Sequence, residues 1–134
     1  MNNIESNLKI KSIYFSELSF RREEKIKQTF ELNHSFDVSY SDVSKNSIKV
    51  SIIYSNKSND SLFETHATIN GRFELTNYEE FDEEVIESLL KINTLAILIP
   101  YLRSQIVLLT SQIGMNPVQI PILNAELLYK STLE

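Results

Sequence analysis

Hydrophobic and polar positions alternate along the chain up to about residue 76. Side chains two residues apart lie on the same face of a β-strand, so this alternation predicts strands that bury one face. Polar, turn-forming clusters at 44–47 and 55–61 separate the later strands. Three consecutive strands with short turns predict an antiparallel meander, and the N-terminal segment predicts a fourth strand. The positions assigned to one face are Leu8, Ile10, Ser12 and Tyr14; Phe30, Leu32, His34, Phe36, Val38 and Tyr40; Ile48, Val50, Ile52 and Tyr54; and Phe63, Thr65, Ala67, Ile69, Gly71 and Phe73.

After residue 78 the apolar spacing becomes that of a helix. Carboxylates at 79–84 lie where negative charge favours the positive end of a helix dipole. Residues 95–109 are apolar on nearly every side, so more than one surface has to cover them. The amphipathic face predicted for the start of this helix consists of Phe81, Val85, Leu89, Ile92 and Ala96.

The end of the chain carries its own helix signals. Gly114 and Pro117 are predicted to end the long helix. Asn124 is a suitable N-cap for a last short helix over 125–130. Pro100 leaves two interpretations open, because it either kinks one continuous helix or begins a new one.

Strands at about 6–76 followed by helices at about 79–114 and 124–131 predict one α+β domain over 1–134. Its architecture is a four-stranded antiparallel sheet with one long and one short C-terminal helix on one face. Helices on one side leave the other sheet face, and part of the apolar helix, without cover. This surplus of apolar surface predicts self-association, unless a long loop closes over these faces.

Composition and charge exclude several classes of protein. The chain has 134 residues, with 13 Lys and Arg against 18 Asp and Glu, and this negative balance argues against nucleic-acid binding. It has no cysteine for a disulfide or thiolate site, and its two glycines cannot build a phosphate-binding loop. Residues 95–109 fall short of the about 20 apolar residues of a membrane span. No secretory signal pattern is visible at the start, so a soluble cytoplasmic protein is expected.

No catalytic constellation is visible. His34 and His66 are the only histidines, both in predicted strands, and no close-spaced ligand motif joins them to a metal site. No serine lies in a nucleophile elbow. The acidic run at 79–87 offers paired carboxylates, although such a run is more often a solvated helix start. The sequence therefore predicts no enzymatic activity, no metal and no cofactor.

The second half of the chain resembles the signature region of SecB, the protein-export chaperone family. Ile99-Pro100-Tyr101-Leu102-Arg103-Ser104 matches that family's Phe-Pro-Tyr-Ala-Arg-Glu-like motif, within a helix that ends in glycine. The run from Pro117 to Tyr129 is similar to the family's extended segment and last helix, and the run from Leu8 to Phe20 to its first strand. The resemblance covers nearly the whole chain in order.

The resemblance implies a dimer of dimers, in which sheets pair across one interface and long helices across another. It also implies an ATP-independent holdase that binds unfolded polypeptide clients in apolar grooves for protein export. Core packing is the alternative role for each client-binding candidate. The implied client-binding residues are Phe36, Val38, Tyr40, Ile120, Leu123, Leu127, Leu128 and Tyr129, and the implied oligomer interface on the long helix is Leu95, Leu98, Leu102, Ile106 and Leu109.

Three departures from the family pattern concern its partners. Ala125 stands where the family has an aromatic residue early in the last helix. The turn at 56–60 lacks the run of acidic residues that contact the SecA motor, and the chain ends at Glu134 without a long tail. The resemblance therefore gives no support for docking on a SecA-type motor. It leaves a second hypothesis open, a dedicated chaperone for a single partner such as an antitoxin.

Overall fold

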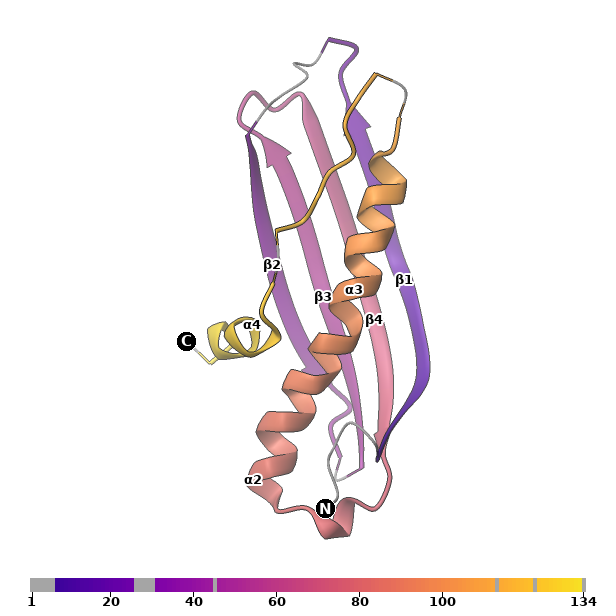
Figure 1. Ribbon diagram of the computed structural model, residues 1–134, viewed down its shortest axis with the longest axis vertical. Helices are drawn as coiled ribbons and strands as arrows, with labels where there is room; N and C mark the ends of the chain where they lie inside the picture. Colours follow the sequence, from indigo (N-terminus) through magenta and orange to yellow (C-terminus); the bar gives the residue numbers. More distant parts are fainter. Residues whose placement is uncertain (1–6, 26–30, 45, 113, 122, 134) are drawn as a thin grey trace.

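The computed structural model describes residues 7–25, 31–44, 46–112, 114–121 and 123–133. Four antiparallel strands form one sheet in the order β1-β4-β3-β2, and the helices follow them in the chain (Figure 1). This arrangement confirms the predicted fold class. The elements are β1 (Leu8–Arg22), β2 (Leu32–Ser41), β3 (Ser47–Ser58), β4 (Phe63–Leu75), a 3-10 turn (Tyr78–Glu80), α2 (Glu83–Val85), a π-helical turn (Ile86–Leu90), α3 (Lys91–Thr110) and α4 (Ala125–Ser131).

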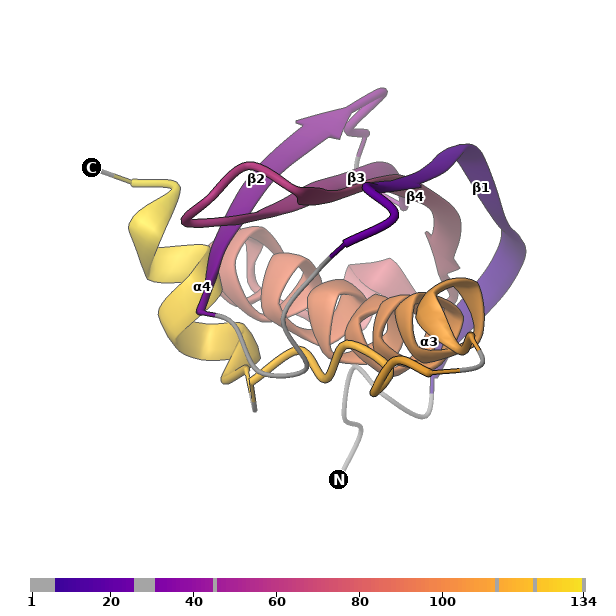
Figure 2. The same cartoon turned by 90° about the horizontal axis from the view of Figure 1, so that it is seen from above.

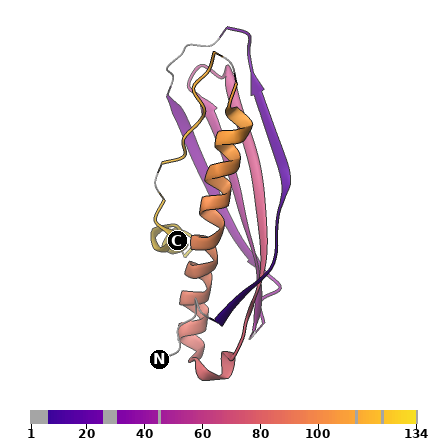
Figure 3. The same ribbon diagram turned by 45° about the vertical axis from the view of Figure 1, so that its right-hand side comes forward.

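The molecule has two layers. Seen from above, the sheet lies on one side of α3, and α4 lies beside α3 near β2 (Figure 2). The view turned about the vertical axis shows α3 running along the length of the sheet (Figure 3). After α3 the chain turns back as an extended segment, 115–121, which leads to α4.

Strict alternation in β3 and β4 builds the helix-facing side of the sheet. Ile52 pairs with Ile69 and Tyr54 with Ala67, and all four are buried. The opposite face of these strands carries mainly polar side chains, with Ile53 as a half-exposed exception. Because this second face is polar, it does not need the apolar cover that the sequence suggested.

Strand β1 departs from simple alternation. Its pairing with β4 shifts between Ile10 and Ser12 and again between Phe15 and Glu17. Each shift inserts an extra residue and reverses which side chains face the helix layer. Tyr14 consequently pairs with Asn70 on the polar side, so the predicted grouping of Tyr14 with Leu8 is wrong. Phe30, predicted for the face of β2, lies outside the described residues.

The long helix runs from Glu83 to Thr110 without interruption, with Pro100 inside it on the exposed side. Pro100 therefore does not begin a new helix. The start is later than predicted because Asn77 is left-handed, with φ 55°, and Phe81 is extended. The end is earlier than Gly114, since Ser111 is already extended.

The face of this helix that packs on the sheet differs from the predicted one. The predicted positions Leu89 and Ala96 are exposed. The π-helical turn, Ile86–Leu90, accounts for the difference, because its wider turn rotates the residues before it relative to those after it. The buried stripe consists of Leu90, Thr94, Leu95, Leu98, Ile99, Leu102, Ile106 and Thr110.

By length and composition alone, the helical run Glu83–Thr110 is sufficient for a membrane span, with a mean hydropathy of 1.5 in its most apolar window. The sequence-based view that the apolar stretch is too short is therefore wrong as stated. A helix that packs one side on a sheet can be equally long and apolar, so length and composition do not distinguish it from a membrane span. Here α3 packs on β4 and β3, and the side chains that face them are fully buried.

Candidate functional site

A cluster of three side chains joins β2, α3 and α4. The rings of Tyr40 and Tyr129 meet edge to face, with centroids 6.5 Å apart. The Lys91 ammonium lies 5.1 Å from the centre of the Tyr40 ring, a cation–π contact, and 2.6 Å from the Glu87 carboxylate. Burial and the neighbouring Tyr129 raise the pKa of Tyr40, so its hydroxyl stays neutral. The cluster fixes α4 beside the edge of the sheet.

The position of α4 exposes one of its leucines. The Asn124 side chain caps the helix by accepting hydrogen bonds from the backbone N–H groups of Glu126 and Leu127, at 2.9 and 3.2 Å. With Tyr129 turned toward the core, Leu128 is half-buried and Leu127 is 64% exposed. The short helix therefore offers an apolar side chain to solvent next to the tyrosine cluster.

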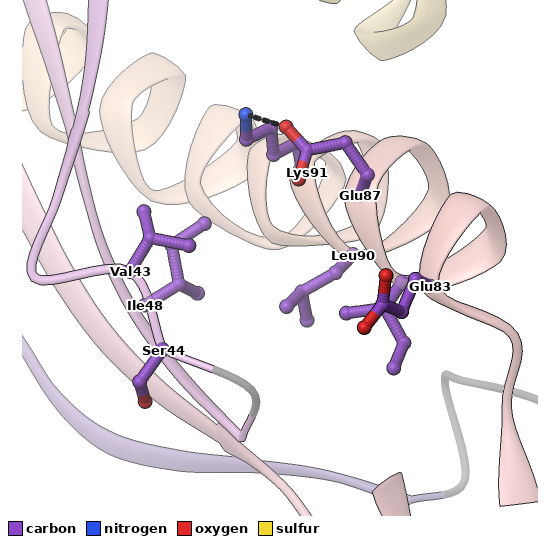
Figure 4. Close-up of a pocket in the computed structure, with 8 residues that line it drawn as sticks. Val43, Ser44, Ile48, Glu83, Glu87, Leu90 and Lys91 are labelled. Atoms are coloured by element: carbon purple, nitrogen blue, oxygen red, sulfur yellow. Dashed lines mark hydrogen bonds and ion pairs between the residues drawn. The ribbon is translucent and has the colours of Figure 1, made fainter. Parts of the chain in front are cut away.

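A first recess of about 330 Å³ lies between the β2–β3 connection and the start of the helix. Figure 4 shows Val43 and Ile48 on the strand side, facing Leu90 and Glu83 across the opening. The same picture shows Lys91 tied to Glu87 at the rim. The recess thus has apolar walls and a rim of charged side chains. Its lining is Val43, Ser44, Ile48, Glu83, Ile86, Glu87, Leu90 and Lys91.

A second recess of about 280 Å³ lies between the second half of α3 and the returning extended segment. Pro100, Val107 and Ile120 supply apolar surface, and Arg103 contributes the one charge among the lining residues. Ser104 and Gln119 complete the lining with neutral polar groups. Both recesses therefore belong to the helix layer and not to the polar face of the sheet.

Large apolar side chains are also exposed along the helix. Tyr101 is half-exposed and Leu108 is 68% exposed, both on the side of α3 that faces away from the sheet. Leu89, directly before the first residue of the buried stripe, is also exposed. These positions leave apolar side chains in contact with solvent at the start and along the second half of the long helix.

Neither histidine forms a catalytic arrangement. His34 Nδ1 lies 2.7 Å from the Tyr54 hydroxyl, which accepts a hydrogen bond from the Asn56 amide at 2.8 Å. The Tyr54 hydroxyl proton is available to Nδ1 of a neutral His34, and burial, which disfavours the charged ring, lowers the pKa of His34. On the polar face His66 pairs with Glu64, and that hydrogen bond is the main cause that lowers the pKa of Glu64. Within the described ranges, no three His, Cys, Asp or Glu side chains are grouped as metal ligands.

The predicted client-binding residues fall into three classes of exposure. Ile120 and Tyr129 are buried, at 2% and 8% exposed, and pack in the core. Leu127 is exposed. The structure brings Tyr40 and Tyr129 together and places Ile120 in the lining of the second recess, while the half-buried candidates pack around the core. The half-buried members are Phe36, Val38, Tyr40, Leu123 and Leu128.

The predicted oligomer interface needs correction. Four of its five side chains are 0% exposed, because they form the stripe that packs on the sheet within the protomer. Of the five, only the Leu109 side chain is partly exposed to solvent. Tyr101 and Leu108 lie on the opposite side of this helix, which stays exposed in the protomer. The four buried residues are Leu95, Leu98, Leu102 and Ile106.

Sequence reasoning missed several residues of this surface. Tyr101 and Leu108 lie outside the stripe anchored by Leu98, so a helical projection centred on the correct stripe identifies them. Arg103 could have been singled out from the sequence, because it is the only charged residue between Lys91 and Glu126. No periodicity pointed to Val43, which the turn after β2 places at the first recess.

A family model and one solved structure point to the same fold. The sequence matches the protein family described as "Preprotein translocase subunit SecB" over residues 1–134. No curated protein sequence gives a significant match. The structure resembles the SecB-like chaperone Rv1957 of Mycobacterium tuberculosis, solved with a ChAD peptide from the Rv1956 HigA1 antitoxin, with a TM-score of 0.63 and 19% identity over 89% of each chain. A protein of unknown function from Streptococcus agalactiae has a TM-score of 0.48 and 9% identity over 86% of this chain and 97% of the other.

Proposed function

This chain belongs to the SecB family of chaperones, and we propose on that premise that it holds non-native polypeptides without ATP. The observation that carries the proposal is that Tyr101, Leu108 and Leu127 expose apolar side chains on the helix layer, which also contains two recesses. An unfolded client exposes apolar side chains and unpaired backbone groups. It therefore gains free energy when such a surface removes them from water.

Among the residues of α4, we expect Leu127 to contribute most to client binding. It is 64% exposed and lies two residues before Tyr129, which anchors the helix. An exposed leucine on an anchored element loses little conformational freedom when a client covers it. Contact with a client therefore keeps most of the gain from burial, about 1.5–3 kcal/mol for a side chain of this size.

We also propose the assembly and setting implied by the family, a dimer of dimers in the cytoplasm. Edge strand β1 supports sheet pairing because it has only one neighbour, β4. The exposed Tyr101 and Leu108 support contact between the long helices of two copies. Delivery of clients to protein export follows from the family description alone.

Aggregation of chemically denatured, unrelated proteins tests the holdase proposal. We expect the parent protein, without ATP, to suppress light scattering of several such clients at about stoichiometric ratios. Leu127→Ser should weaken this protection without unfolding the protein. Leu133→Ser is the matched control, because Leu133 is also exposed, at 68%, but lies beyond the end of α4. Failure to protect any client, or equal effects of the two substitutions, would contradict the proposal.

A second candidate function uses the same surface for one dedicated partner. The similar SecB-like chaperone was solved with an antitoxin peptide, which motivates this alternative. It predicts co-purification of a single abundant polypeptide, selective binding of one segment of that polypeptide and no protection of unrelated clients. Protection of several unrelated clients would reject it in favour of the general holdase.

A further inference from the structure

Arg103 is a half-buried cation for which the described residues provide no anion. No hydrogen bond or ion pair joins its guanidinium to any residue that the structure describes, in contrast to Lys91, which pairs with Glu87. The sequence around it is also free of acids, since residues 92–102 and 104–125 are all uncharged. Partial removal of a cation from water without a partner is unfavourable, so this position favours an anionic ligand.

The surroundings of Arg103 specify which kind of anion. Pro100, Val107 and Ile120 line the same recess with apolar surface, and its volume is about 280 Å³. That volume suits one or two side chains and is too small for a folded partner. The planar guanidinium donates two parallel hydrogen bonds to a carboxylate, a geometry that a lysine ammonium cannot reproduce. The recess therefore matches a carboxylate that is flanked by apolar groups.

The wall opposite α3 favours a ligand with an extended backbone. Segment 115–121 has no helical or strand ladder beyond an isolated bridge at Met115. Residues 116–121 make one hydrogen bond to the rest of the described chain: the Val118 N–H donates to the Thr110 hydroxyl, at 2.8 Å. Gln119 is exposed in this stretch, and its backbone N–H and C=O have no hydrogen-bond partner among the described residues, so they are available to an extended peptide.

We propose that this recess binds an acidic side chain, Asp or Glu, of an extended client segment. The client carboxylate pairs with the Arg103 guanidinium, and the apolar side chain beside it packs on Pro100 and Val107. This inference rests on the proposed function and adds a preference to it. The first recess does not share that preference, because Glu83 stands at its rim without a cationic partner among the described residues.

Two labelled peptides test the inference. Both are unstructured and apolar, and they differ only in one central residue, glutamate in one and glutamine in the other. Fluorescence anisotropy at low salt measures their affinity for the parent, for Arg103→Gln, for Arg103→Lys and for the control Lys9→Gln. Lys9→Gln removes a positive charge at an exposed position of β1, so it tests for a general charge effect.

The parent should bind the glutamate peptide about five- to tenfold more tightly than the glutamine peptide, as expected for a charge-assisted pair at a partly exposed site. Arg103→Gln should abolish this ratio, Arg103→Lys should keep part of it and Lys9→Gln should keep all of it. Equal binding of both peptides by the parent, or an unchanged ratio in Arg103→Gln, would overturn the inference while leaving the holdase function intact. A loss of assembly mass in Arg103→Gln with an unchanged ratio would overturn it in favour of an anion from a second copy. Binding of neither peptide would overturn the proposed function, and the inference with it.

Discussion

The backbone N–H of Val118 donates a hydrogen bond to the Thr110 hydroxyl, at 2.8 Å, and both residues are buried. The same hydroxyl donates to the Ile106 carbonyl at 2.7 Å. One side chain therefore satisfies a carbonyl in the last turn of α3 and an amide of the returning segment. It fixes where the extended segment lies against the helix, and so positions one wall of the second recess.

Replacement of this hydroxyl should loosen the returning segment. Thr110→Val keeps the shape of the side chain but leaves the Val118 amide buried without an acceptor. We expect a loss of about 1–3 kcal/mol in the free energy of unfolding, measured by urea denaturation. Ser111→Ala is the control, because the exposed Ser111 hydroxyl also donates to a helix carbonyl but holds no other segment. Its cost should stay within about 0.5 kcal/mol, and equal costs for the two variants would contradict the role of Thr110.

Alternation predicted β2, β3 and β4 well, because each pairs with a neighbour without a shift in register. The face of β1 was not predictable in the same way. Its two bulges depend on how the strand pairs with β4, which the local pattern of β1 does not contain. Tyr14 therefore lies on the opposite side of the sheet from the one that its spacing from Leu8 suggested.

The candidate site was less predictable than the fold. Residues 95–109 are apolar on nearly every side, so the pattern could not say which leucines meet the sheet. The structure answers this by burying Leu98 and exposing Leu108. Tyr40 and Tyr129 were both predicted for one surface, but their contact depends on the path of the uncharged segment 115–121, for which the sequence gives no periodicity.

Gly71 should tolerate no side chain, because α3 crosses β4 closely at this point. A Cβ at position 71 would lie 2.6 Å from the ring of Phe73 and 2.8 Å from the Leu98 side chain, and both neighbours are fully buried. We expect Gly71→Ala to cost about 1–3 kcal/mol in the free energy of unfolding, because neither neighbour can move freely. Ser39→Ala, on the exposed face of β2, should be nearly neutral. Equal thermal midpoints for Gly71→Ala and the parent would show that the core adapts.

Acid should destabilise the protein through His34. Burial lowers the pKa of His34 in the folded state below its ordinary value of 6.5. The folded state therefore binds fewer protons than the unfolded state, and stability is lost as the pH falls from about 6.5 towards the lower pKa of the folded state. Protonation also makes His34 Nδ1 a donor, so its contact with the Tyr54 hydroxyl, at 2.7 Å, then requires the hydroxyl oxygen to accept.

Urea unfolding at about pH 8 and about pH 5, for the parent and for His34→Gln, measures this effect. The parent should lose more stability between the two values than the variant does. Glu64 also contributes to stability, because the hydrogen bond from His66 lowers its pKa in the folded state. That contribution is complete above the unfolded pKa of 4.5, so it stays nearly constant between the two pH values. Identical losses in the two proteins would exclude His34 as the titrating group.

The two sides of α3 should respond oppositely to a charge. Ile106 is fully buried against the sheet, so Ile106→Lys should prevent folding or expose the core, with loss of the cooperative thermal transition. Leu108 is 68% exposed, so Leu108→Lys should leave the free energy of unfolding of the protomer within about 0.5 kcal/mol. If the long helices of two copies meet through this side, the same substitution lowers the mass measured by light scattering.

Circular dichroism separates the two effects, because only Ile106→Lys should change the folded spectrum. A folded Ile106→Lys protein, or an unfolded Leu108→Lys protein, would contradict the assignment of the two sides. An unchanged mass for folded Leu108→Lys would instead place the helix-mediated contact elsewhere.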